Sequence, residues 1–197
     1  MSFYWPARNF CLLFCKFYFH LEAKGKEHIP RKGGFVVASN HASFLDPVLL
    51  GSACPRGLNF AARDSLFKNP LLRYLISNVG AFPIKRWSAD LAAVKESVRR
   101  LSLNAGLVVF PEGTRSPDGV LQPMSHGFAL LAAKARVPII PAWISGSYKA
   151  WGKKSKIMRP VKITVVFGQP LWVEKKQPYP EVARKVFDRI KDLSKTC

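Results

Sequence analysis

FVVASNHASFLDP, residues 35–47, predicts a strand, a turn and the start of a helix in quick succession. Its first five residues form a continuous apolar run, which is typical of a strand buried on both faces. Asp46 and Pro47 then predict a helix start, because aspartate is a good N-cap and proline is favoured at the first helical position. Strand–helix units of this kind build parallel α/β sheets.

The same alternation continues along the chain, and it predicts one α/β domain with a mostly parallel central sheet flanked by helices. In such sheets functional groups gather in the loops beyond the carboxyl ends of the strands. Further strands are predicted at residues 21–30 (an edge strand that leads into a turn), 58–62, 81–84, 106–110, 139–144 and 161–167. Further helices are predicted at residues 65–78 (with Asn69-Pro70 near the start or at a break), 88–103, 127–135 and 180–195.

The most apolar stretch, FCLLFCKFYF at residues 10–19, lies close to the N-terminus. Ten helical residues cover roughly 15 Å, about half the hydrocarbon thickness of a bilayer, and Lys16 interrupts the run. We therefore expect residues 1–21 to form an apolar interfacial helix that lies in one leaflet, with Trp5 and Tyr18 at the lipid–water boundary. The alternative is a helix packed on the protein's own core.

Charge is the outlying property of the 197-residue chain. Lys and Arg total 31 against 12 Asp and Glu, a net charge of +19, which implies an anionic partner: a membrane surface, nucleic acid or a phosphorylated substrate. Nucleic acid is disfavoured because the aromatic residues lie in apolar runs and not on a basic face. The four cysteines show no metal-ligand spacing, so we expect reduced thiols and no metal site.

His41 and Asp46 are the first candidate catalytic residues. Five residues apart on a helix would separate them by about 140°, whereas a turn between strand and helix can fold one onto the other. A carboxylate on one imidazole nitrogen leaves the other nitrogen free to act as a base toward a hydroxyl. The alternative is that Asp46 only caps the helix. A serine nucleophile at Ser43 is disfavoured, because the chain has no G-x-S-x-G elbow.

A second polar cluster, FPEGTRSPDG at residues 110–119, follows another predicted strand. Gly113 and Thr114 can expose backbone N–H groups, and Arg115 carries a guanidinium suited to phosphate. Glu112 can orient that arginine or a substrate hydroxyl. The alternative is an ordinary polar turn with a local ion pair. A third cluster, GAFPIKR at residues 80–86, can add positive charge to the same face.

Taken together, these clusters resemble the glycerolipid acyltransferases, specifically the 1-acylglycerol-3-phosphate (lysophosphatidate) acyltransferases. His41 and Asp46 fit the H-x4-D motif of that family. Three further blocks match in order: GAFPIKR ending on Arg86, FPEGTRS, and VPIIPA at residues 137–142. The resemblance covers residues 22 to about 175, and it makes residues 22–197 the expected acyltransferase domain.

The resemblance implies a mechanism and a set of site residues. His41, oriented by Asp46, would take the proton of the sn-2 hydroxyl of lysophosphatidate, and the alkoxide would attack an acyl thioester to give phosphatidate. No cofactor and no metal is implied; acyl-CoA or acyl-ACP is the co-substrate. The substrate-binding residues that it implies are Arg86, Glu112, Gly113, Thr114, Arg115 and Ser116.

Alternatives of other classes remain open at the level of sequence. One is acyl transfer to another acceptor, glycerol-3-phosphate or a different lysophospholipid. Another is a non-catalytic basic module that binds lipid or nucleic acid. For the acyltransferase we expect a peripheral or monotopic protein on the cytoplasmic face of the cell membrane, held by the anionic membrane surface. The basic segment between Lys149 and Lys162 would contribute if it faces lipid.

Overall fold

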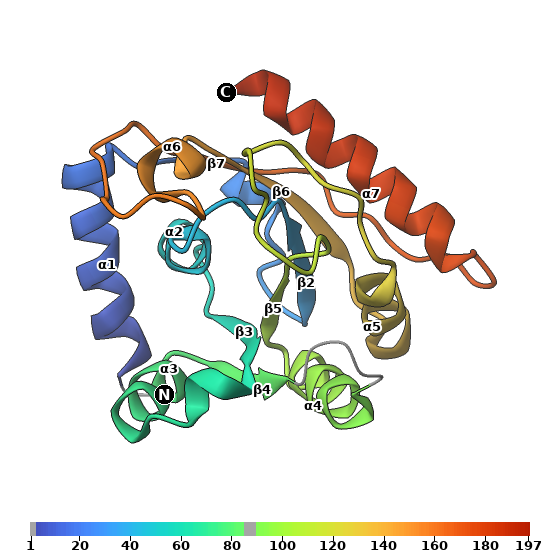
Figure 1. Cartoon of the computed structure of the whole chain (residues 1–197). Coiled ribbons are helices and arrows are strands. Elements are labelled where there is room, and N and C mark those ends of the chain that lie inside the picture. Colours follow the sequence, from blue (N-terminus) through green and yellow to red (C-terminus); the bar gives the residue numbers. More distant parts are fainter. Residues whose placement is uncertain (1–2, 85–89) are drawn as a thin grey trace.

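The computed structural model describes residues 3–84 and 90–197, which form a seven-stranded sheet with helices on both faces (Figure 1). The strand order is β1-β7-β6-β2-β5-β3-β4. Neighbouring strands are parallel except β6 and β7, so the predicted mostly parallel α/β sheet is confirmed. The strands are β1 (Glu22–Lys24), β2 (Phe35–Ser39), β3 (Leu58–Arg63), β4 (Ala81–Ile84), β5 (Gly106–Val109), β6 (Ile139–Ser145) and β7 (Thr164–Phe167).

Two hydrophobic cores lie on the two faces of the sheet. Along β2 the side chains alternate: Val37 packs with the helices α1 and α2, whereas Val36 and Ala38 pack with α4, α5 and α7. Figure 1 shows these two sets of helices on opposite sides of the sheet. The helices are α1 (Tyr4–Phe19), α2 (Asp46–Ala53), α3 (Pro70–Asn78), α4 (Leu91–Ser102), α5 (Gly127–Ala135), α6 (Ser147–Trp151) and α7 (Tyr179–Leu193).

Several predicted boundaries differ from the structure for local reasons. The edge strand predicted at residues 21–30 ends at Lys24, where Gly25 adopts a positive φ of 71° and turns the chain. α3 begins at Pro70 and not at residue 65, because the Asn69 side chain caps it by accepting the Leu72 N–H at 3.0 Å. The short helix α6 was not predicted.

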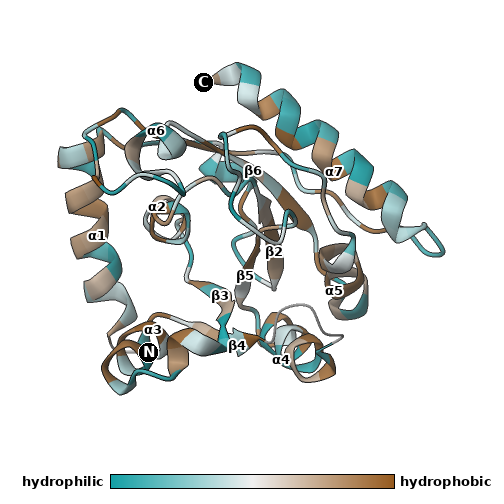
Figure 2. Cartoon of the chain, in the orientation of Figure 1, coloured by the Kyte–Doolittle hydropathy of each residue, from teal (hydrophilic) through white to brown (hydrophobic). Residues whose placement is uncertain are grey.

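α1 packs one of its sides on the domain, as the second of the two alternatives predicts, and exposes the other side. Its inner side is packed on the domain: Cys15 and Phe19 are buried, and the buried Tyr4 hydroxyl accepts the Leu58 N–H at 2.8 Å. Its outer side exposes large apolar residues, which Figure 2 shows along the helix. These residues are Phe3, Trp5, Phe10, Leu13, Phe14 and Phe17. Within the described ranges, no helix is both long enough and apolar enough to cross a bilayer.

Arg8 joins α1 to the C-terminal end of α2. Its guanidinium donates to the carbonyl oxygens of Gly51 at 3.2 Å, Ser52 at 3.1 Å and Cys54 at 2.8 Å. These carbonyls belong to the last turn of α2, where a helix leaves its acceptors unpaired and its dipole favours a cation.

We expect Arg8→Ala to lower the free energy of unfolding by about 2 kcal/mol, because several charge-assisted hydrogen bonds are lost and backbone acceptors are left partly buried. Urea denaturation measures the change. The matched control is Lys16→Ala on the exposed side of the same helix, expected to stay within about 0.5 kcal/mol of wild type. Equal stability of the two variants would show that the contacts of Arg8 do not hold α1 in place.

Candidate active site

The turn after β2 is fixed by side chains that reach the neighbouring elements. Asn40 accepts the backbone N–H of Ile144 at 2.8 Å and donates to its carbonyl at 3.1 Å. The Ser43 hydroxyl donates to the Trp151 carbonyl at 2.7 Å and accepts the Leu45 N–H at 3.1 Å. Ser43 is fully buried and its hydroxyl is used in the turn, which agrees with the exclusion of a serine nucleophile.

The turn brings His41 and Asp46 into contact. His41 Nδ1 lies 2.8 Å from Asp46 Oδ2, and the same oxygen accepts the backbone N–H groups of Ala42 and Ser43, each at 2.7 Å. Asp46 is fully buried, whereas the His41 side chain is 12% exposed. With Nδ1–H donating to the carboxylate, Nε2 carries the lone pair and can accept a proton.

The expectation that Asp46 caps α2 is wrong. Leu45 occupies the N-cap position without a side-chain cap, and Asp46 is the first residue of the helix. Its carboxylate turns back toward the preceding turn, where the two N–H groups and the imidazole bind it. The helix start therefore serves to aim the carboxylate at His41.

The loop after β5 holds His41 from the other side. The imidazole stacks on the Phe110 ring, with centroids 4.0 Å apart and planes at 17°. Glu112 Oε1 accepts the His41 backbone N–H at 2.6 Å, and its Oε2 accepts the Gln122 N–H at 3.1 Å. The Ser116 N–H donates to the His41 carbonyl at 2.7 Å. The loop thus binds both backbone polar groups of His41.

Burial raises the pKa of Glu112 to about 7. The N–H groups of His41 and Gln122 oppose this rise because they favour the carboxylate, while the charges of Asp46 and Asp118 add to it. Glu112 therefore joins the turn at His41 to the β5 loop through hydrogen bonds, and its carboxyl group has a pKa near neutral pH.

Arg115 supplies a cation beside the turn. Its guanidinium lies 3.4 Å from the centroid of the Phe44 ring, and its Nη1 is buried without a hydrogen-bond partner in the described part of the chain. Burial lowers the Arg115 pKa, and the charge of Arg63 at the end of β3 lowers it further, against the opposing effect of Asp46. Two arginines therefore meet near the dyad. The predicted Arg86 lies outside the described residues.

The other predicted substrate-binding residues lie in the same loop, but much of their polar capacity is used within it. The Gly113 N–H donates to the Phe110 carbonyl at 3.0 Å, and Gly113 adopts a φ of 70°. The buried Ser116 hydroxyl donates to Asp118 Oδ1 at 2.8 Å. Thr114 stands partly exposed between them. This geometry assigns Gly113 and Ser116 a part in shaping the loop that presents Arg115.

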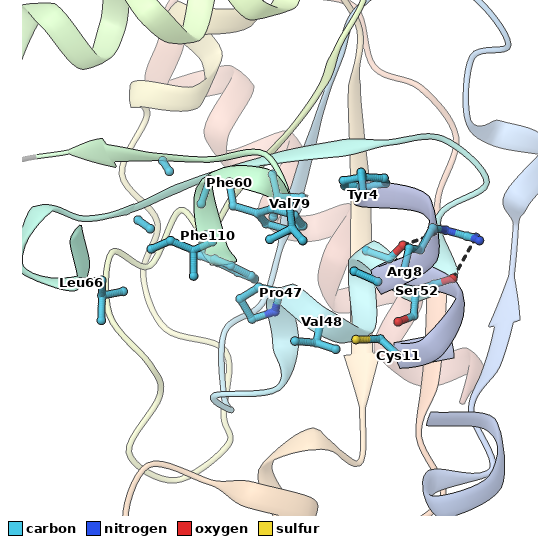
Figure 3. Close-up of a pocket in the computed structure, with 17 residues that line it drawn as sticks. Tyr4, Arg8, Cys11, Pro47, Val48, Ser52, Phe60, Leu66, Val79 and Phe110 are labelled. Atoms are coloured by element: carbon cyan, nitrogen blue, oxygen red, sulfur yellow. Dashed lines mark hydrogen bonds between the residues drawn. The ribbon is translucent and has the colours of Figure 1, made fainter. Parts of the chain in front are cut away.

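An apolar cavity of about 290 Å³ is lined by side chains from strands and helices before residue 111, among them Phe110 (Figure 3). It lies between α1, α2, β3 and the region of α3, and Phe110 connects it to the imidazole, since this ring lines the cavity and stacks on His41. Its lining includes Tyr4, Cys11, Val48, Phe60, Leu66 and Val79. The sequence did not reveal it, because its walls come from segments far apart in the chain.

Arg63 and Phe110 were also missed as site residues. Arg63 ends β3, and Phe110 directly follows β5, the strand that pairs with β3. A cation and an aromatic residue at the carboxyl ends of neighbouring strands were a usable signal, since that edge of a parallel sheet carries the site.

The fold and the site together combine an α/β sheet with a buried carboxylate that contacts a histidine, beside arginines and an apolar cavity. Comparison with known proteins gives the family. The family model described as "Acyltransferase" matches residues 20–145. The chain belongs to this acyltransferase family.

Relatives and a solved structure agree with this assignment. A 1-acyl-sn-glycerol-3-phosphate acyltransferase of Limnanthes alba is 34% identical over 86% of this chain and 62% of its own length. The Bacillus subtilis protein of the same name is 26% identical over 74% of this chain and 71% of its own. The crystal structure of the 1-acyl-sn-glycerophosphate (LPA) acyltransferase PlsC from Thermotoga maritima superposes with a TM-score of 0.76, at 26% identity, over 95% of this chain and 80% of that one. The chain thus spans about three fifths of the Limnanthes relative.

The raised pKa of Glu112 predicts a pH dependence of stability. Its folded pKa of about 7 lies above the ordinary 4.5, so the folded state binds the proton more tightly, and the contribution to stability is lost as pH rises between these values. Glu112→Gln removes this titration. We expect the free energy of unfolding of the variant, relative to wild type, to increase from pH 5 to pH 8 in urea titrations. A difference that stays constant with pH would contradict the shift.

Proposed function

We propose that this protein transfers a fatty acyl group from an acyl thioester to the sn-2 hydroxyl of lysophosphatidate and forms phosphatidate. The observation that carries this proposal is the His41–Asp46 contact of 2.8 Å placed beside an arginine, Arg115, whose buried Nη1 has no partner among the described residues. A base and an anion-binding group next to each other fit an acceptor that carries both a hydroxyl and a phosphate. The names of the relatives support the same acceptor.

The geometry supports direct transfer. His41 Nε2 takes the proton of the hydroxyl while Asp46 stabilises the imidazolium that forms. The alkoxide oxygen bonds to the thioester carbonyl carbon, and the C–S bond breaks when the tetrahedral intermediate collapses. The proton held by His41 then goes to the leaving thiolate, so the base is regenerated. The Ser43 hydroxyl, bound to Trp151, takes no part.

Arg115 and Arg63 provide the phosphate-binding charge in this proposal. The planar guanidinium of Arg115 is held against Phe44, so its N–H groups are pre-oriented for phosphate oxygens. Burial is the main cause of the lowered pKa of Arg115, and repulsion from Arg63 adds to it; a dianionic group that binds between the two arginines relieves this repulsion. Arg86, Glu112 and Thr114 remain proposed members of the same substrate-binding region.

The apolar cavity supplies the space for an acyl chain. Its walls come mainly from aliphatic and aromatic side chains, and it meets the dyad at Phe110. A chain lying there would place its carbonyl end near His41. Acyl-CoA and acyl-ACP are both proposed as donors, since both present a thioester on an anionic carrier that suits the net charge of +19.

We place the protein on the cytoplasmic face of the cell membrane, as a peripheral or monotopic enzyme. The support is the outer side of α1, where Phe10 and Phe17 are 72% and 80% exposed, together with the excess of basic residues. Removing residues 1–21 would also delete the buried Phe19 and the contacts of Arg8, so surface substitutions are the better test of the anchor.

The dyad makes a direct prediction. We expect His41→Ala and Asp46→Asn each to lower kcat for acyl transfer to lysophosphatidate by about a thousandfold, since the positioned base is lost or left in the wrong tautomer. Purified protein is assayed with both donors, and the product is identified by mass spectrometry. The control is Ser43→Ala, which should keep most of the rate at a temperature where it is folded. Loss of activity in the control together with a fully active His41→Ala would refute this mechanism.

Arg115 predicts a separation of binding from chemistry. Arg115→Gln should raise the KM for lysophosphatidate by about 10- to 100-fold, because charge-assisted hydrogen bonds to the phosphate are lost, while kcat changes less. With monoacylglycerol, which lacks the phosphate, wild type and variant should differ little. An equal loss of activity on both acceptors would contradict a phosphate-binding role for Arg115.

A further inference from the structure

α3 packs on the domain less closely than other helices of similar length. None of its residues is buried, and it rests on β4, the edge strand, and on the short 3-10 helix η2 (Asp64–Phe67). Other helices of comparable length, such as α2 and α5, bury several side chains in the two cores. α3 therefore contributes little to the core of the domain.

The outer side of α3 carries an apolar stripe. Leu71, Tyr74 and Leu75 are 69%, 65% and 42% exposed, and their i, i+3, i+4 spacing puts them on one face of the helix. A helix that packs only on its own domain turns such a stripe inward. Figure 2 shows hydrophobic residues along α3, as along α1. Three large exposed apolar side chains together indicate a contact surface.

The charge around this stripe is positive. Lys68 and Arg73 are exposed, and neither forms an ion pair within the described ranges. Asp64 is the one acidic residue between Arg63 and Asn78. An apolar stripe with a cationic border is complementary to an anionic lipid leaflet, in which apolar side chains enter below the headgroups and Lys or Arg stay among them.

The position of α3 points to the same partner. Ile76 on its inner side and Val79 just after its end form part of the wall of the apolar cavity. α1 lines the same cavity from another side. Figure 1 shows the N-terminal end of α1 beside α3. The two helices with the most exposed apolar surface thus flank the cavity that is proposed to hold the acyl chain.

We propose that α3 is a second membrane-contact element, in which Leu71, Tyr74 and Leu75 enter an anionic leaflet and Lys68 and Arg73 bind its headgroups. This inference rests on the proposed function, because a lipid acceptor gives such a contact its use. It orients the molecule so that the cavity faces the leaflet between α1 and α3, and the acceptor reaches the dyad without leaving the lipid phase.

The test uses the full chain with the double variant Leu71→Gln and Leu75→Gln, which removes apolar surface without changing charge. The matched control is Leu91→Gln with Leu103→Gln, at residues that are 70% and 66% exposed at the two ends of α4, behind the other face of the sheet. Circular dichroism melting checks that both variants fold as wild type. Co-sedimentation with vesicles of phosphatidylglycerol and phosphatidylcholine should show about tenfold weaker binding for the α3 variant alone.

Activity assays separate the failure of this inference from that of the proposed function. The α3 variant should acylate vesicle-embedded lysophosphatidate more slowly at limiting lipid, and a short-chain, monomeric lysophosphatidate at the wild-type rate. If wild type acylates neither acceptor, the proposed function is wrong. The membrane contact of α3 is still tested in that case, because vesicle binding is measured without turnover.

Three outcomes would overturn the inference itself. Equal vesicle binding of the α3 variant, wild type and the control would show that the stripe does not contact lipid. Equal binding of wild type to pure phosphatidylcholine vesicles would remove the role of the cations. A wild-type dimer in light scattering that the α3 variant converts to a monomer would assign the stripe to a second copy of the chain.

Discussion

One carboxylate oxygen organises the site. Asp46 Oδ2 accepts hydrogen bonds from two successive backbone N–H groups, of Ala42 and Ser43, and from His41 Nδ1. Three donors on this atom offset part of the cost of burying the carboxylate, whose other oxygen, Oδ1, has no hydrogen-bond partner among the described residues. The same three bonds fix the turn and the imidazole together, so the orientation of the base is a property of the backbone and not of a single flexible side chain.

The sheet determines which other groups reach this turn. β2 lies between β6 and β5. From β2 the chain builds β3, β4 and β5 on one side, and from β5 it crosses to β6 on the other, so the carboxyl ends of these central strands form a topological switch point. Asn40 ties the turn to Ile144 on one side, and Glu112 ties His41 to the β5 loop on the other. Arg115 belongs to the same β5 loop. The dyad and its cation are therefore brought together by strand order and not by nearness in the sequence.

The sequence predicted the parts of this protein that depend on local pattern. The apolar runs predicted most strands, and the pattern of residues 180–195 predicted the last helix, whose buried side holds Val182, Val186 and Ile190. The His41–Asp46 contact followed from a turn at the right place. What failed or was missed depends on distant segments: the acceptors of Arg8, the approach of Arg63 to Arg115, and a cavity whose walls meet only after folding.

The pairing of β1 with β7 has a consequence for biosynthesis. Glu22 pairs with Thr164, and the Phe19 carbonyl accepts the Ile163 N–H at 3.0 Å, so the end of α1 is covered by a strand that is synthesised long after it. Nascent chains emerge N-terminus first, and contacts this distant in sequence form late. The aromatic helix therefore leaves the ribosome well before the strand that covers its end has been synthesised.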